Sequence, residues 1–299
     1  MNHIDIVDER FRSLTVAAAV PERLYDGGRW LEGPLWLADS EQLLFSDIPA
    51  DRVLRWVPGL GVATIRAPAG FQNGRARDLQ GRVVACEHGG RRLVRTELDG
   101  SLGVLCDSHG GRRLNSPNDV VVKGDGSIWF TDPDYGILSD HEGHRAPREQ
   151  DACHVFRLDL GAREPVAVVG HMVRPNGLAF NPEQSILYVA DSGGSHSADG
   201  RPHHIRRFAV QADAALVDCG VFAEITPGLP DGMAVDELGN VWTSAGDGVH
   251  CIDPAGELLG RILLPETVSN LCFGGAHRDR LFITATRSLY TIPVAVRGA

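Results

Sequence analysis

The stretch from Asn176 to Asp191 decides the fold of this chain. It consists of Asn176-Gly177-Leu178-Ala179-Phe180, a turn at Pro182-Glu183-Gln184, and the β-rich run Leu187-Tyr188-Val189-Ala190-Asp191. The same order of polar residue, short apolar segment, turn and β-rich run occurs six times in the 299 residues. We call the polar residues that begin the six copies the openers; they are Glu32, Asn73, Asn118, Asn176, Asp231 and Asn270. Each opener lies 14 or 15 positions before the end of its β-rich run, so the copies share one register.

The spacing of the openers predicts a β-propeller. Successive openers are 41, 45, 58, 55 and 39 residues apart, mostly near the ~40–50 residues of a four-stranded blade. No stretch of about ten residues keeps a helical apolar period without Gly or Pro. We therefore predict an all-β chain that forms a single domain over residues 1–299, a six-bladed propeller of four-stranded antiparallel blades. Separate tandem domains are the alternative, although one blade cannot bury both of its faces alone.

The last copy of the pattern is too short for four strands. After Asn270 the chain has room for three strands before Ala299. We predict that a segment within residues 21–25 supplies the outer strand of the last blade, because this would close the ring and remove an open sheet edge.

Two insertions account for the long intervals between openers. They cover residues 135–151 and 192–203 and follow equivalent β-rich runs. We therefore expect both to rise from the same face of the ring, where long loops usually carry binding residues.

Composition excludes several classes of partner. The formal net charge is −10 and no block of Lys or Arg is present, which argues against nucleic acid. No apolar stretch approaches the ~20 residues that span a bilayer, and no signal-peptide pattern opens the chain. We expect a cytoplasmic protein that contacts neither membrane nor nucleic acid; the sequence leaves its oligomeric state open. The six cysteines are scattered and are expected to be reduced.

The openers point to a metal ion. Because the innermost strand of each blade lines the central channel, the six openers should form a ring of two carboxylates and four carboxamides. Such oxygen ligands suit a hard divalent cation, with Ca²⁺ first and Mg²⁺, Mn²⁺ or Zn²⁺ as alternatives. The competing interpretation is that Asn-Gly and Asp-Gly form turns. For Asn73 and Asn270 the two interpretations are equally good.

Five motifs carry a resemblance to a known family. They are Trp30-Leu31-Glu32-Gly33-Pro34, Asn115-Ser116-Pro117-Asn118-Asp119-Val120, Phe130-Thr131-Asp132-Pro133-Asp134-Tyr135-Gly136, Arg174-Pro175-Asn176-Gly177-Leu178-Ala179-Phe180 and Pro230-Asp231-Gly232-Met233-Ala234-Val235-Asp236. Together they resemble the regucalcin/gluconolactonase family, which includes senescence marker protein, and its bacterial gluconolactonase branch in particular.

The resemblance implies a lactonase. It implies a six-bladed propeller with one catalytic divalent cation at the channel mouth, held by Glu32, Asn176 and Asp231, with Asn118 as a further ligand or a substrate contact. The cation would polarise the carbonyl of a sugar-acid lactone. Asp231 would activate water as a general base, or else attack as the nucleophile. The alternatives are hydrolysis of phosphotriesters or organophosphates and a non-catalytic calcium-binding propeller.

Substrate recognition is where the chain departs from the animal branch of the family. That branch has an arginine two residues before the position of Asn118, and this chain has Ser116 there. The candidate substrate contacts are Asn73, Arg113, Asn115, Asn118 and Tyr135. The segment His141-Glu142-Gly143-His144 is expected to be a solvated lid, and Ser195-His196 is not expected to form a catalytic triad.

Overall fold

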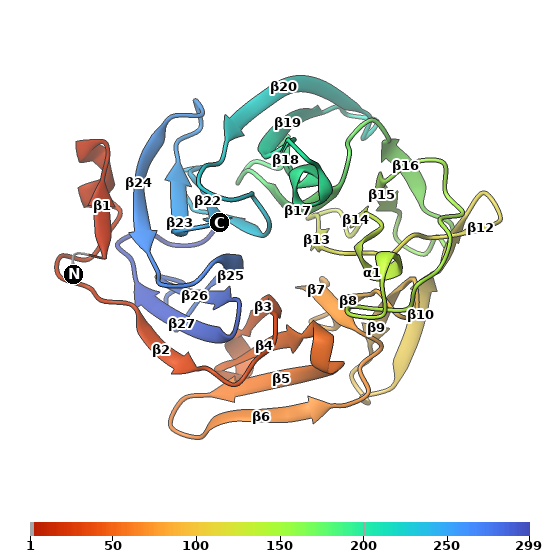
Figure 1. Ribbon diagram of the computed structural model, residues 1–299, viewed down its shortest axis with the longest axis horizontal. Coiled ribbons are helices and arrows are strands. Elements are labelled where there is room, and N and C mark those ends of the chain that lie inside the picture. The colour runs from red at the N-terminus through yellow and green to blue at the C-terminus, as the bar shows by residue number, and fades with distance from the viewer. Residues whose placement is uncertain (1–2, 200) are drawn as a thin grey trace.

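The computed structural model describes residues 3–199 and 201–299. Six antiparallel sheets surround a central channel (Figure 1), which confirms the predicted six-bladed propeller. From the channel outward, the first three sheets contain β3 (Leu31–Leu37), β4 (Gln42–Asp47), β5 (Arg52–Val57) and β6 (Gly61–Arg66); β7 (Gln72–Arg77), β8 (Val83–Glu87), β9 (Arg92–Thr96) and β10 (Leu102–Cys106); and β13 (Val120–Val122), β14 (Ile128–Asp132), β15 (His154–Leu158) and β16 (Val166–Val169).

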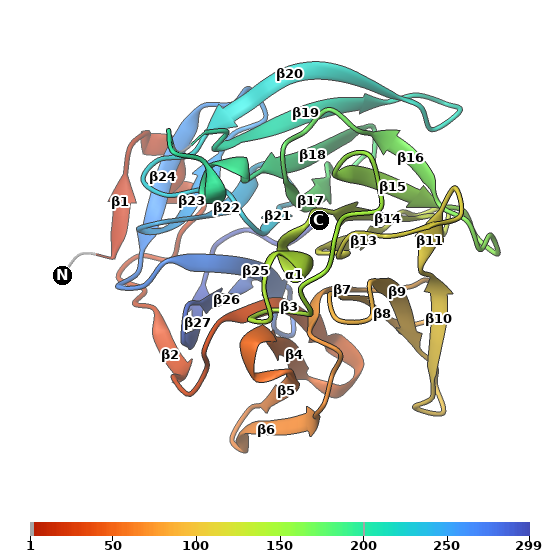
Figure 2. The same ribbon diagram turned by 45° about the vertical axis from the view of Figure 1, so that its right-hand side comes forward.

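The other three sheets complete the ring. They contain β17 (Pro175–Phe180), β18 (Ile186–Asp191), β19 (His204–Val210) and β20 (Leu216–Glu224); β21 (Met233–Val235), β22 (Val241–Ala245), β23 (Gly248–Ile252) and β24 (Leu258–Leu263); and β25 (Val268–Gly274), β26 (Arg280–Ala285) and β27 (Ser288–Pro293). A small hairpin of β11 (Ser108–His109) and β12 (Arg112–Arg113) lies outside these sheets. Figure 2 shows the ring obliquely, with outer strands β6, β10, β16 and β20 at its rim.

The N-terminal segment closes the ring as predicted. Strand β2 (Glu22–Tyr25) pairs with β27 and becomes the outermost strand of the sixth sheet. Strand β1 (Ile4–Ile6) was not predicted; it pairs with β24 and adds a fifth strand to the fifth sheet. Both strands therefore cover sheet edges that would otherwise be open to another chain.

The core lies between neighbouring sheets. One apolar cluster joins the fifth and sixth sheets and includes Phe11, Trp242 and Tyr290. Another joins the sixth sheet to the first, where the rings of Trp36 and Phe282 stack with centroids 5.0 Å apart. Each sheet is thus buried by its neighbours, as expected when a single blade cannot cover its own faces.

Glycine follows four of the openers because the inner strands approach each other closely at the axis. A Cβ on Gly177 would lie 2.1 Å from the carbonyl oxygen of Asp231, and one on Gly232 would lie 2.0 Å from Oδ1 of Asn270. The Asn-Gly pairs at residues 73–74 and 176–177 lie in β7 and β17, not at turns. The turn-former interpretation of these pairs was therefore wrong: tight packing around the channel requires the glycine.

Both insertions lie at one mouth of the channel. The first contains the short helix α1 (Tyr135–Leu138), and the second contains the 3₁₀ turn η4 (Gly193–His196); Gly200 lies outside the described residues. The Tyr135 hydroxyl is 3.2 Å from the carbonyl oxygen of Ser192 and 3.3 Å from Oγ of Ser195, so the two insertions touch. None of the helices in the described part of the chain has the length and apolarity that crossing a bilayer requires.

Candidate active site

A cavity of about 320 Å³ lies at the channel mouth beneath the two insertions. Five of the six openers line it, and Asn270 does not. The remaining lining residues come from the insertions and from segments beside the inner strands. The full lining is Trp30, Glu32, Ile48, Asn73, Asn118, Tyr135, Glu142, Asn176, Ser192, Ser195, His196, Gly228, Leu229, Pro230, Asp231, Gly246, Thr267 and Val268.

Breaks in strand register place the openers. The pairing of β3 with β4 shifts between Glu32 and Leu35, and that of β17 with β18 shifts between Pro175 and Leu178. Such irregularities bend a strand and redirect a side chain. At these two blades, the shift allows the openers to line the cavity while the rest of each strand keeps its pairing.

Buried carboxylates hold the segments that precede the openers. Asp47 Oδ1 accepts hydrogen bonds from the backbone N–H groups of Arg29 and Trp30, just before Glu32. Asp132 and Asp191 accept backbone hydrogen bonds in the same way in the third and fourth sheets. These acids therefore stabilise the blade segments that position the openers.

Acidic side chains are concentrated in the cavity. Burial raises the pKa of Glu32 to about 8, and the nearby Asp119 carboxylate adds to the shift. Burial also raises the pKa of Asp231 well above its ordinary value, with further contributions from Glu32, Asp119 and Glu142. Carboxylates gathered with so little water repel each other, and a bound cation would relieve that repulsion.

The polar atoms in the cavity suit a hard divalent cation. Oδ1 of Asn176 is buried and has no hydrogen-bond partner, which is costly unless another group binds it. Glu32, Asn118 and Asp231 supply further oxygens in the same cavity, and oxygen ligands are those that Ca²⁺ and Mg²⁺ prefer. Two of the four donors are carboxamides; within residues 3–199 and 201–299, no group of three His, Cys, Asp or Glu side chains is arranged to hold a metal.

Asn73 is tied to the first insertion through His88. The imidazole donates from Nδ1 to the backbone carbonyl of Glu142 at 3.0 Å, which leaves Nε2 to accept from the Asn73 amide at 3.3 Å. Burial lowers the pKa of His88 to about 4, so the ring is neutral at physiological pH. This histidine joins a cavity residue to the loop that covers the cavity.

Three of the predicted substrate contacts line the cavity, and two do not. Asn73, Asn118 and Tyr135 are part of the lining. Arg113 is exposed, with Nη2 bonded to the carbonyl of Gly90. Asn115 is buried and its amide donates to the carbonyls of Asp132 and Ala152, so it supports the loop instead of facing a substrate. Neither Arg113 nor Asn115, which were predicted to contact the substrate directly, is among the residues that line the cavity.

Ser116 also has a supporting role. Its Oγ donates to the carbonyl oxygen of Pro133 at 2.6 Å and accepts from the backbone N–H of Gly136 at 2.9 Å. Ser116 therefore anchors the start of the first insertion. The position that the animal branch fills with arginine is thus used here to hold α1.

Several cavity residues were not predicted. Glu142 was assigned to a solvated lid, but it lines the cavity, while its neighbours His141 and His144 are exposed. Trp30, Ser195 and His196 also line it. Their positions in the sequence could have indicated this. Each lies near an opener or in one of the two insertions, which were expected on the same face of the ring.

The chain is similar to proteins of one known family. Residues 30–287 match the family model described as the SMP-30/gluconolactonase/LRE-like region. The chain is 31% identical over 297 residues to a gluconolactonase of Zymomonas mobilis, covering 90% of this chain and 80% of the relative. It is 28% identical over 264 residues to the pentonolactonase XacC of Haloferax volcanii, covering 85% and 80% respectively.

A solved structure is similar over nearly the whole chain. The gluconolactonase XC5397 of Xanthomonas campestris superposes with a TM-score of 0.91 at 38% identity, covering 98% of this chain and 95% of that one. Residues 30–287, which match the family model, include all six openers and both insertions. The chain belongs to the SMP-30/gluconolactonase/LRE-like family.

Proposed function

We propose that this protein is a lactonase that hydrolyses a sugar-acid lactone with the help of one divalent cation, Ca²⁺ in the first place. Glu32, Asn118, Asn176 and Asp231 would hold the cation, and Asp231 would also act as general base. The gluconolactonase and pentonolactonase activities named for its relatives support the substrate class. The observation that carries the proposal is the buried, unpartnered Oδ1 of Asn176 beside two carboxylates in one cavity.

The cavity residues can divide the reaction between them. When bound, the cation supplies a Lewis acid for the lactone carbonyl and keeps the neighbouring carboxylates ionised. Asp231 accepts a proton from water as the water oxygen bonds to the carbonyl carbon. The ring C–O bond then breaks, and the departing oxygen takes that proton, which leaves an open hydroxy acid.

An acid-release assay tests the proposal. Hydrolysis of glucono-1,5-lactone should stop when a chelator removes the cation and return when Ca²⁺ is added. Asp231→Asn should lower kcat by about 10²-fold or more, while calorimetry follows whether the cation still binds. An Asp231→Asn protein that binds Ca²⁺ and keeps full turnover would remove the role of Asp231. Faster release of fluoride from a fluorophosphate than of acid from the lactone would favour the phosphotriesterase alternative.

The charge of the cavity favours an uncharged lactone. Glu32, Asp231 and Glu142 line it, and its lining includes no lysine or arginine; the remaining basic group, His196, has a pKa lowered by burial. Three carboxylates and one divalent cation leave a net negative charge, which repels an anionic substrate.

We therefore expect kcat/KM for glucono-1,5-lactone to exceed that for its 6-phosphate by at least about tenfold, which corresponds to roughly 1.4 kcal/mol. The comparison uses one enzyme preparation saturated with Ca²⁺. Replacing Glu142 by Gln should narrow the ratio because it removes one negative charge. Equal rates on both lactones would show that the carboxylates do not select the substrate.

A further inference from the structure

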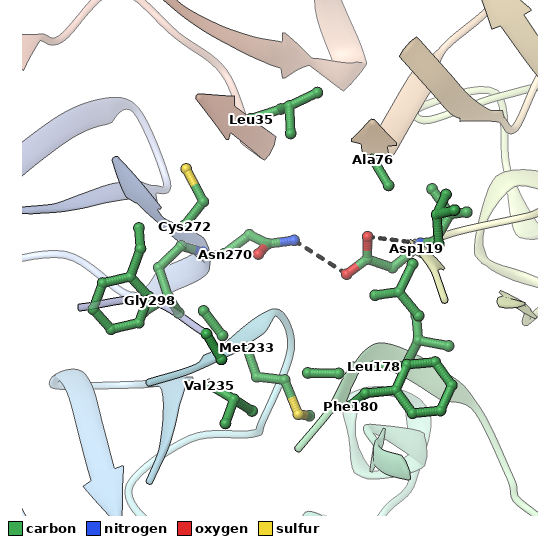
Figure 3. Close-up of a pocket in the computed structure, with 18 of the residues that line it drawn as sticks. Leu35, Ala76, Asp119, Leu178, Phe180, Met233, Val235, Asn270, Cys272 and Gly298 are labelled. Atoms are coloured by element: carbon green, nitrogen blue, oxygen red, sulfur yellow. Dashed lines mark hydrogen bonds between the residues drawn. The ribbon is translucent and has the colours of Figure 1, made fainter. Parts of the chain in front are cut away.

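The sixth opener, Asn270, lies beneath the active-site cavity. It is 6% exposed and borders a second cavity of about 410 Å³, which is lined by residues farther along the inner strands and by the C-terminal residues Gly298 and Ala299. Figure 3 shows Asn270 and Asp119 pointing toward each other across this second cavity. Asn270 and Asp119 therefore lie on the side of the ring of openers that faces the second cavity, away from the active-site cavity.

The hydrogen bonds of Asn270 define its orientation. Its Oδ1 accepts from the backbone N–H of Leu271 at 2.8 Å. Its amide nitrogen consequently faces two carboxylates: Nδ2 is 3.2 Å from Oε2 of Glu32 and 3.5 Å from Oδ2 of Asp119. One carboxamide thus bridges the proposed ligand Glu32 and a second acid, Asp119.

Glu32 is held by one of its two oxygens. Oε2 accepts from the amide of Asn270 and from the backbone N–H of Gly33, the latter at 2.9 Å. Both donors engage the same oxygen, which leaves Oε1 for the cavity that Glu32 lines. Without Asn270, Oε2 would keep only the Gly33 donor, and the carboxylate could rotate.

The surroundings of Asn270 restrict its movement. A Cβ added to Gly232 would lie 2.0 Å from Oδ1 and from Cγ of Asn270, so this glycine leaves room for the carboxamide. The adjacent Ser269 Oγ donates to the carbonyl of Leu31 at 2.5 Å, which ties β25 directly to β3. The strand that carries Asn270 is therefore fixed against the strand that carries Glu32.

We propose that Asn270 is a positioning residue that orients Glu32 as a cation ligand, with Asp119 anchoring the same amide from the other side. The inference rests on the proposed cation site. Partners that orient a ligand usually contribute 10–100-fold to metal affinity. Asn270 acts through Glu32 and touches no substrate, because it lies outside the active-site cavity.

Calcium affinity measures this role directly. We expect Asn270→Ala and Asn270→Leu to weaken Ca²⁺ binding by about 10–100-fold in calorimetry, with kcat within about threefold of wild type once Ca²⁺ is saturating. Asn270→Ala opens onto the second cavity, where water can replace the side chain, so it guards against failure of the leucine variant to fold. Thermal melts in chelator report the folding of each cation-free protein.

Asn240→Leu is the matched control. Asn240 is also buried, and its amide donates to the carboxylate of Asp236 at 2.8 Å, but neither residue borders the active-site cavity. This variant should destabilise the cation-free protein and leave Ca²⁺ affinity unchanged. Wild-type affinity in both Asn270 variants, or an equal loss in Asn240→Leu, would overturn the positioning role. Failure of the wild-type protein to bind any divalent cation would instead overturn the proposed function.

Discussion

His88 shows how one residue can link the cavity to its cover. Its side chain is 1% exposed and accepts from Asn73 while donating to the backbone of Glu142. A protonated ring would lose the acceptor that Asn73 uses and would place a charge in a buried position. The neutral imidazole is therefore part of the folded arrangement of the first insertion.

The low pKa of His88 predicts a pH-dependent contribution to stability. Burial lowers the pKa from 6.5 to about 4 in the folded state, so between these values the unfolded chain binds a proton that the folded chain does not. The stabilisation by His88 is complete above pH 6.5 and is lost as the pH falls toward 4. The loss within this window approaches about 1.4 kcal/mol per pH unit.

Denaturant unfolding of His88→Asn and wild type at several pH values checks this prediction. The difference in the free energy of unfolding between the two proteins should shrink as the pH falls from 6.5 to about 4.5. His277→Asn, at an exposed position, is the control and should show no such trend. A difference that stays constant with pH would mean that the His88 pKa is not lowered by folding.

At the scale of elements, the short strand β2 closes the ring. Four residues, Glu22–Tyr25, pair with β27 and close the ring, and Leu24 and Tyr25 pack against the cluster between the first and sixth sheets. By contrast, the three residues of β1 add a strand to a sheet that already has four. The two N-terminal strands should therefore differ in their importance for stability.

Deleting residues 1–26 should destabilise the protein far more than deleting residues 1–7. The longer deletion exposes the edge of β27 and removes apolar contacts, and we expect a loss of several kcal/mol, or roughly 10 °C or more in Tm. It should also promote association through the open edge, visible in size-exclusion chromatography. The shorter deletion removes β1 and keeps Phe11 in the core. Equal melting temperatures for both would contradict the closing role of β2.

At the scale of the whole molecule, the proposed ligands connect distant parts of the ring. Glu32 lies in the first sheet, Asn118 precedes β13 of the third, Asn176 lies in the fourth, and Asp231 precedes β21 of the fifth. A single cation would thus join four blades that are otherwise held by contacts between neighbours. Its binding should stabilise the entire propeller.

Calorimetric melting tests this stabilisation. Free Ca²⁺ at 100 times its Kd should add about 2.7 kcal/mol to the free energy of unfolding, and a chelator should reverse the gain. At the same free Ca²⁺ concentration, Glu32→Gln should show a smaller gain in the free energy of unfolding, because it removes one charged ligand and so raises the Kd. A Tm that does not change with any divalent cation would contradict the proposed cation site.

The periodic part of this structure could be predicted from the sequence. Six copies with constant internal spacing imply six equivalent sheets, and equivalence alone brings residues such as Glu32, Asn176 and Asp231 to one end of a channel. Closure by residues 21–25 followed from counting the strands that remained after Asn270. These inferences need no knowledge of side-chain packing, because repetition along the chain becomes symmetry in space.

The tertiary structure alone decided which non-repeating side chains reach the cavity. Glu142 enters it because the path of the irregular first insertion depends on anchors such as Ser116 and His88 that no period reveals. Arg113 does not enter it, since it lies on the small hairpin outside the six sheets. Asn270 occupies an opener position like the others, yet it bridges Glu32 and Asp119 beneath the site. The repeat specifies the blade on which a residue lies, whereas the direction of its side chain is set by contacts with other blades.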